Sequence, residues 1–339
     1  MNTYDHNYQP TIPSRWEGRF DGTAYDLLRW HQVIRLVNLR EKPIPSLQKG
    51  QHGIAIVGFF SDEGVRRNKG REGAEEGPFM IRKACANFPV HFSEEVRFID
   101  VGDVTCYHPR LEESQYTLGQ IVGDLLLANY FVIIIGGGHE VTLGHYWGVK
   151  KFLEQQTSKQ WGIYNLDTHL DLRQVDERIG ATSGTSFYQI AQDRISNGLP
   201  FDYCCLGVQE WSNTKRLLDT AESWGVTIVK GEHLLENLPA TIQTIDHFAQ
   251  KNTYLSLSID LDVFAAAFAP GVSATAFQGI IPDANFQRLL KHVYRYPNLI
   301  SMDIAELNPR FDQDARTAKL AASCIYQVVD IKTSGAKIT

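Results

Sequence analysis

Short apolar runs rich in β-branched residues alternate with segments of helical spacing along most of this 339-residue chain. A strand that is apolar at every position is covered on both faces, and parallel strands need a crossover, usually a helix, between them. The alternation therefore predicts an α/β protein with helices on both faces of a mostly parallel sheet. We expect about eight strands, at residues 54–60, 96–101, 131–135, 162–166, 203–208, 226–229, 254–259 and 299–304.

No repeat, low-complexity tract or linker interrupts this pattern, so we expect residues 1–339 to form one domain. Residues 1–50 lack the alternation and are expected to form an irregular leader with a helical stretch at residues 26–39.

The charge balance gives no reason to expect a nucleic-acid partner, because 33 basic and 39 acidic residues leave a net charge of −6. No apolar stretch is long enough to cross a bilayer, and residues 1–16 contain no signal peptide. The five cysteines include no CxxC pair, which favours buried free thiols in a reducing cytoplasm. We therefore expect a cytoplasmic protein that binds neither nucleic acid nor a membrane.

Three polar segments follow expected strands: residues 136–140 (GGGHE), 167–171 (DTHLD) and 258–262 (SIDLD). In a parallel sheet, ligands bind beyond the carboxyl ends of the strands, where these segments lie. So many ionisable groups at a core edge favour a bound multivalent cation. A lone histidine after a glycine turn, or a lone DxD, is more often structural; the combination of all three segments indicates a metal site.

The spacing within these segments suits metal coordination. Asp167, His169 and Asp171 are spaced by two, so an extended backbone points all three the same way, and Asp260 and Asp262 repeat this spacing. Four aspartates and two histidines could hold two divalent ions about 3.5–4 Å apart if some carboxylates bridge them. The oxygen-rich ligand set favours Mn²⁺ over Zn²⁺.

With residues 303–309 (DIAELNP), these segments resemble, in order, the GG(D/G)H, DxHxD, SxDxD and DxxExNP segments of the arginase/agmatinase family of binuclear manganese ureohydrolases. The resemblance covers residues 50–335 and implies a three-layer α/β/α fold with a central sheet of eight strands. It implies that one manganese ion is held by His139, Asp167, Asp171 and Asp260, and the other by Asp167, His169, Asp260 and Asp262. Family members are commonly homo-oligomers.

Within this family the chain resembles the formimidoylglutamases, in residues 16–19, 29–32, 67–74, 136–140, 171–173 and 212–214. That resemblance implies hydrolysis of N-formimidoyl-L-glutamate to L-glutamate and formamide, a step of histidine degradation. In it a hydroxide that bridges the two ions attacks the formimidoyl carbon. Asp171 would pass the proton to the departing nitrogen, and Glu306 would face the cationic N–C–N group.

A substrate with two carboxylates needs cationic or hydrogen-bond-donating partners. Arg173 and Ser183 match positions that contact the substrate carboxylate in arginases, and Arg71 is a further candidate; Glu140 and His145 receive no role. Phe187 occupies the place of the arginase proton-shuttle histidine, and Ser212 occupies that of an aspartate that faces the α-amine of the substrate in arginases. Both departures from the arginase pattern disfavour arginine as the substrate. The alternatives are another ureohydrolase (a guanidino acid hydrolase, agmatinase or arginase) or a non-catalytic metal-binding relative.

Overall fold

The computed structural model describes residue 4 and residues 6–336. It contains the expected sheet. The sheet has ten strands in the order β1-β4-β3-β5-β10-β9-β6-β7-β8, with β2 paired to β4. The eight expected strands are β3 (His52–Phe60), β4 (Val96–Thr105), β5 (Tyr130–Ile135), β6 (Trp161–Leu166), β7 (Asp202–Val208), β8 (Thr227–Lys230), β9 (Tyr254–Asp260) and β10 (Leu299–Ala305). They all pair in parallel, which confirms the predicted α/β class.

The leader differs from its prediction. It adds two strands to the sheet, β1 (Tyr8–Gln9) and β2 (Arg35–Leu36), each too short for periodicity to reveal. The helix expected at residues 26–39 is wrong over most of its length, because α1 covers only Trp30–Val33. The Trp30 ring packs edge-on against Phe88 and Phe98, with ring centroids 5.3 and 5.0 Å apart, so tertiary aromatic packing helps to fix this segment.

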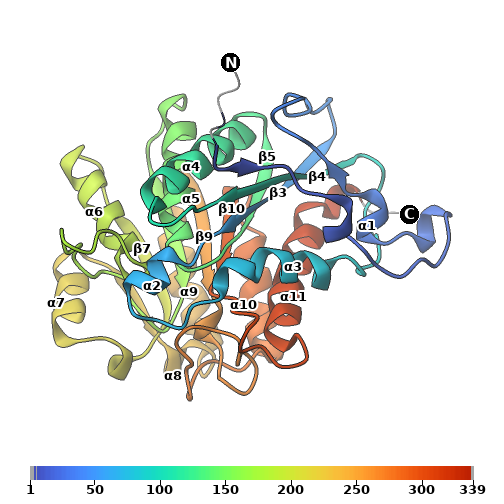
Figure 1. Cartoon of the computed structure of the whole chain (residues 1–339). Helices are drawn as coiled ribbons and strands as arrows, with labels where there is room; N and C mark the ends of the chain where they lie inside the picture. Colours follow the sequence, from blue (N-terminus) through green and yellow to red (C-terminus); the bar gives the residue numbers. More distant parts are fainter. Residues whose placement is uncertain (1–3, 5, 337–339) are drawn as a thin grey trace.

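Helices cover both faces of the sheet (Figure 1). One face packs against α3 (Gly77–Cys85), α9 (Leu238–Gln250), α10 (Ala284–Tyr294) and α11 (Arg316–Lys332). The other packs against α4 (Leu111–Leu127), α5 (Val141–Glu154), α6 (Ser186–Ser196) and α7 (Lys215–Ser223). Successive residues of β5 alternate between the two cores, with Ile133 and Ile135 in the first and Val132 and Ile134 in the second. The three-layer α/β/α arrangement is confirmed.

Two short helices come soon after strands: α2 (Glu63–Arg67) begins three residues after the end of β3, and α8 (Gly231–Leu234) follows β8 directly. The expected free thiols are present: all five cysteines are buried and unpaired, namely Cys85, Cys106, Cys204, Cys205 and Cys324. Among the described residues, no helix is both long and apolar enough to cross a membrane.

Candidate metal centre and substrate cavity

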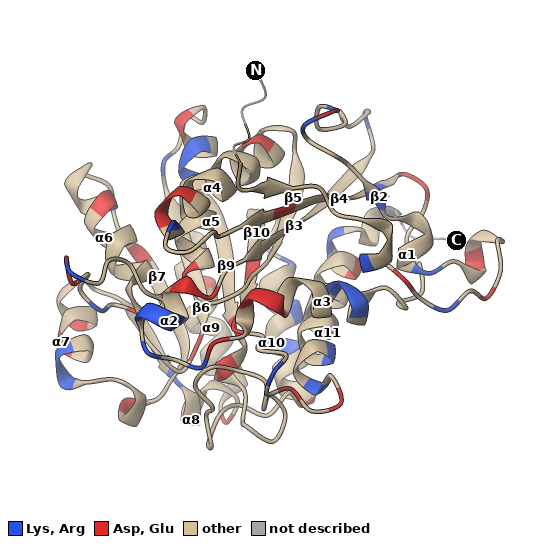
Figure 2. Ribbon diagram, in the orientation of Figure 1, with Lys and Arg blue, Asp and Glu red and all other residues tan. Residues whose placement is uncertain are grey.

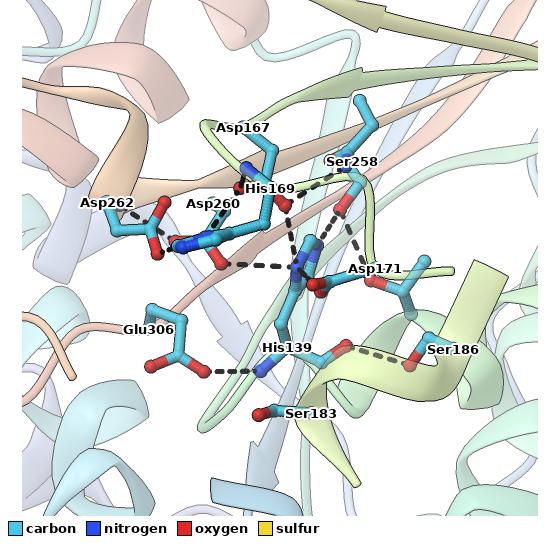
Figure 3. A network of polar contacts seen from close by, with 12 residues as sticks. His139, Asp167, His169, Asp171, Ser183, Ser186, Ser258, Asp260, Asp262 and Glu306 are labelled. Carbon is cyan, nitrogen blue, oxygen red and sulfur yellow. Dashed lines mark hydrogen bonds and ion pairs between the residues drawn. The ribbon is translucent and has the colours of Figure 1, made fainter. Parts of the chain in front are cut away.

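The polar segments follow four strands that are neighbours in the sheet, β5, β10, β9 and β6. Because these strands are parallel, their carboxyl ends lie at one edge and bring the segments together (Figure 3). The turn after β5 depends on glycine, since a β-carbon on Gly137 would lie 1.7 Å from the carbonyl oxygen of Ser61. That close approach places His139 at the start of α5, above the strand ends.

His139 is surrounded by three carboxylates. Its Nδ1 lies 3.2 Å from Asp167 Oδ2, 2.8 Å from Asp171 Oδ2 and 3.1 Å from Asp260 Oδ2. These four residues are the first predicted ligand set. Ligand atoms of His139, Asp167 and Asp171 all lie within 4.8 Å of one another, so these residues could hold one metal ion.

His169 is the centre of a second group. Its Nδ1 lies 3.4 Å from Asp167 Oδ1 and 3.1 Å from Asp262 Oδ2. Asp167 thus presents one oxygen to each imidazole, the arrangement that a bridging carboxylate needs. Ligand atoms of Asp167, His169 and Asp262 also lie within 4.8 Å of one another, so a second ion could be held beside the first.

The charges of this cluster fit divalent cations. Burial raises the pKa of Asp260 well above its usual range, and the carboxylates of Asp262 and Asp167 raise it further. Burial also raises the pKa of Asp171 and Asp262. Around His169 the effect of burial is outweighed by Asp262 and Asp167, which raise the imidazole pKa to about 12. Buried carboxylates raise one another's pKa when the site around them holds too little positive charge to neutralise them. Bound cations would supply that charge.

A buried polar network lies behind His139. The Nε2 of His139 is 2.9 Å from Ser258 Oγ, and Ser258 Oγ donates to Asp303 Oδ1 at 2.7 Å. The other oxygen of Asp303 is 2.6 Å from His145 Nδ1, and His145 Nε2 is 2.7 Å from Ser301 Oγ. No role was predicted for these four residues, although Ser258 and Asp303 lie within two of the motifs. Their place in the motifs was the available signal.

Glu306 lies on the opposite side of His139 from Ser258 (Figure 3). Its Oε1 accepts a hydrogen bond from the backbone N–H of His139 at 2.8 Å, while Oε2 is buried and has no partner among the described residues. Burial and the nearby Glu140 raise the pKa of Glu306 to about 8. Glu306 and Asp171 both have left-handed backbones, with φ of 70° and 48°. Such strain in non-glycine residues clusters at active sites.

A cavity of about 360 Å³ opens above the cluster. Arg173, Ser183, Arg71 and Ser212 line it, together with Asn68, Lys69, Gly70, His139, His169, Asp171, Asn213, Leu217, Asp260, Asp262, Ser273, Ala274 and Glu306. The predicted substrate-binding residues are therefore brought to one cavity with most of the predicted ligands. Phe187 does not line it, because its ring is buried and stacks on Tyr203 with centroids 4.3 Å apart.

The predicted substrate-binding side chains differ in what they contact. Arg173 is exposed, and its guanidinium has no partner among the described residues. Ser183 Oγ accepts a hydrogen bond from Asn68 Nδ2 at 3.2 Å. Arg71 Nε donates to the Ser273 carbonyl at 3.0 Å, and its Nη2 donates to the Val272 carbonyl. Arg71 thus holds two backbone segments together at the cavity wall.

Comparison with known proteins decides the family, since the sequence model of the arginase family matches residues 52–330. This chain belongs to the arginase family. The formimidoylglutamase of Clostridium tetani is 41% identical over 328 residues, 96% of each chain. That of Fusobacterium nucleatum is 40% identical over 318 residues, 93% of this chain and 96% of its own. The resemblance to formimidoylglutamases and the expectation of a hydrolase are confirmed.

Solved structures agree on the fold. A crystal structure of Trypanosoma cruzi formiminoglutamase with Mn²⁺ superimposes with a TM-score of 0.73 at 23% identity, covering 85% of this chain and 95% of that one. The formimidoylglutamase of Bacillus subtilis gives a TM-score of 0.72 at 21% identity, with coverages of 86% and 90%. The arginase-like architecture expected from the motifs is therefore confirmed.

Proposed function

We propose that this hydrolase converts N-formimidoyl-L-glutamate and water to L-glutamate and formamide, a step of histidine degradation, with two Mn²⁺ ions per subunit. Relatives named formimidoylglutamase at about 40% identity over nearly the whole chain support the substrate. The observation that supports the reaction type is the position of Glu306, which lines the cavity above the candidate metal ligands and has one buried carboxylate oxygen without a hydrogen-bond partner among the described residues. A carboxylate there suits a substrate whose reacting N–C–N group is cationic.

The six predicted ligands would hold the metal: His139, Asp167, Asp171 and Asp260 for one ion, and Asp167, His169, Asp260 and Asp262 for the other. When bound, the two ions supply a nucleophilic water of lowered pKa at neutral pH. The oxygen-rich donor set and the buried carboxylates support manganese as the metal.

The chain's own residues perform the remaining steps. Glu306 would orient the formimidoyl group, and the backbone N–H of His139 holds Glu306 through its other oxygen. After water adds to the formimidoyl carbon, the bond from that carbon to the glutamate nitrogen breaks and formamide leaves. Asp171 would take the water proton and give it to that nitrogen. Asp171 suits proton transfer, because its side chain is 12% exposed while Asp167 and Asp260 are 0% and 4% exposed.

We propose that Arg173 and Ser183 bind a substrate carboxylate at the cavity wall, with Arg71 adding positive charge there. The guanidinium of Arg173 has no partner among the residues that the structure describes and so can pair with a carboxylate. Agmatine has no carboxylate that could pair with Arg173, so the unpaired guanidinium at this wall disfavours agmatine as the substrate. The burial of Phe187 in the core likewise leaves no proton shuttle of the arginase kind at that position.

The decisive experiment is a substrate panel with the manganese-loaded protein. Release of formamide and glutamate from N-formimidoyl-L-glutamate would be measured beside turnover of arginine, agmatine and guanidino acids. We expect a clear preference for formimidoylglutamate that is lost in Asp260→Asn and kept in Asp219→Asn, a control at an exposed aspartate on α7. Preference for a guanidino compound would contradict the substrate. Absence of all turnover in a manganese-loaded protein would favour a non-catalytic relative.

We further propose that the protein acts in the cytoplasm as a homo-oligomer and that residues 1–339 form one domain. The five buried, unpaired thiols suit a reducing compartment. Light scattering on the purified protein measures the subunit number, and a monomer at assay concentration would contradict the oligomer.

A further inference from the structure

Three cationic side chains line the cavity, those of Lys69, Arg71 and Arg173. Arg71 already has partners within the protein. Its guanidinium donates to the carbonyls of residues 272 and 273, and its Cζ lies 4.1 Å from the centre of the Phe311 ring. Within the described part of the chain, the side chains of Lys69 and Arg173 have neither a hydrogen bond nor an ion pair. Two unpaired cations therefore face one cavity.

Lys69 has a backbone conformation that usually belongs to glycine. Its φ is 61°, just after the end of α2, where the N–H of Lys69 donates to the Arg66 carbonyl at 3.0 Å and that of Gly70 donates to the Val65 carbonyl at 2.9 Å. The left-handed conformation is strained for a residue with a side chain. A lysine where the backbone favours glycine is a local conflict of the kind expected at functional or strained sites, and here it lies at the cavity wall.

The loop at residues 68–73, which we call the α2 loop, is fixed beside Arg173. Asn68 Nδ2 donates to Ser183 Oγ at 3.2 Å. The β-carbon position of Gly184 lies 3.6 Å from the same Asn68 nitrogen and 3.0 Å from Arg173 Cδ. The α2 loop and the segment that holds Arg173 therefore meet at Gly184. Figure 2 shows basic residues along the chain at and after α2.

We propose that Lys69 binds the side-chain carboxylate of N-formimidoyl-L-glutamate, while Arg173 binds its α-carboxylate. This inference rests on the proposed function. With the formimidoyl carbon at the metal cluster, the α-carboxylate is two bonds from the reacting nitrogen, near Asp171 and the chain that leads to Arg173. The side-chain carboxylate is two methylenes further out, where a long, flexible and exposed lysine can reach it.

The test compares two substrates that differ only at that carboxylate, N-formimidoyl-L-glutamate and N-formimidoyl-L-glutamine. Because the contact between Lys69 and the carboxylate would lie near the surface, its contribution to binding should be at the lower end of the range for hydrogen bonds between charged groups. We expect Lys69→Met to raise the KM for the glutamate substrate about tenfold, with kcat nearly unchanged and the glutamine substrate unaffected. Lys69→Arg should retain most of the preference. Lys49→Met, at an exposed lysine just before the amino-terminal end of β3, is the matched control and should change neither KM.

Lys69→Gly separates this role from folding, because glycine tolerates the left-handed backbone. We expect Lys69→Gly to unfold at the same or a higher temperature than the wild type while losing the same substrate preference as Lys69→Met. If wild type and Lys69→Met have the same ratio of KM values for the two substrates, the role of Lys69 is overturned and the proposed function stands. If the wild-type protein hydrolyses neither substrate, the proposed function fails and this inference fails with it.

Discussion

The two ring nitrogens of His139 have different neighbours. Nε2 lies 2.9 Å from the hydroxyl oxygen of Ser258, whereas Nδ1 lies within 3.2 Å of carboxylate oxygens from three aspartates. Since Ser258 Oγ donates its own proton to Asp303, it can only accept from His139. The N–H of the neutral ring is then on Nε2, and the lone pair of Nδ1 points at the carboxylates. Metal coordination needs this tautomer.

Removing this support should weaken metal binding. Ser258→Ala deletes the acceptor for His139 Nε2, and we expect Mn²⁺ affinity to fall roughly 10–100-fold. Titration of the metal-free protein with Mn²⁺, followed by electron paramagnetic resonance, measures the affinity directly. The control is Ser256→Ala on the same strand, which loses the bond from Trp161 Nε1 at 2.9 Å but lies outside the network. Equal losses of affinity in both variants would show that Ser258 acts only through stability.

Glu306 should affect turnover and leave the metal content unchanged. Glu306→Gln keeps an oxygen that can accept from the His139 N–H but removes the carboxyl group whose ionised form a cationic substrate would stabilise. We expect kcat to fall roughly 100–1,000-fold, as on loss of one preorganised electrostatic group. Metal analysis and steady-state kinetics of the same preparation test this, with Glu113→Gln on the exposed face of α4 as control. Loss of manganese together with activity would contradict a substrate-facing role.

The periodicity of the sequence predicted the eight central strands well because each is a short apolar run covered on both faces. It failed at β2 and at the expected helix of residues 26–39, where packing of the Trp30 ring overrides local spacing.

At the site, the six ligand candidates and Glu306 lie together in the structure, since their backbone positions follow from the strand ends. The sequence could not give the partners of long side chains. Arg71 donates to backbone carbonyls about two hundred residues away in the chain, a relation that no local pattern encodes. For the same reason the contact between His145 and Asp303 could not be predicted, because the two residues are 158 positions apart.

A buried ion-pair cluster that does not line the cavity should control stability alone. Arg82 is fully buried and donates to Asp100 Oδ2 at 2.7 Å and to Asp103 Oδ1 at 2.6 Å. Arg82→Met leaves two buried carboxylates with fewer partners, and we expect about 3–5 kcal/mol of lost unfolding free energy. Urea unfolding measures this loss. The kcat per folded molecule should stay near the wild-type value, and a selective loss of kcat would contradict a purely structural role.

Acid should destabilise the protein through Glu63, the first residue of α2. Burial of Glu63 is outweighed by hydrogen bonds from Arg66, His108 and Arg67, which lower its pKa to about 2. Because the folded-state pKa lies below the unfolded value near 4.5, the pairing stabilises the protein above pH 4.5 and is lost as the pH falls toward 2. Glu63→Gln should therefore lower the melting temperature at pH 7 and narrow its difference from the wild type as the pH falls from 4.5 to 2.5. Glu113→Gln, at an exposed glutamate, serves as the control. A difference between Glu63→Gln and wild type that stays constant over that range would show that the charge of Glu63 does not stabilise the fold.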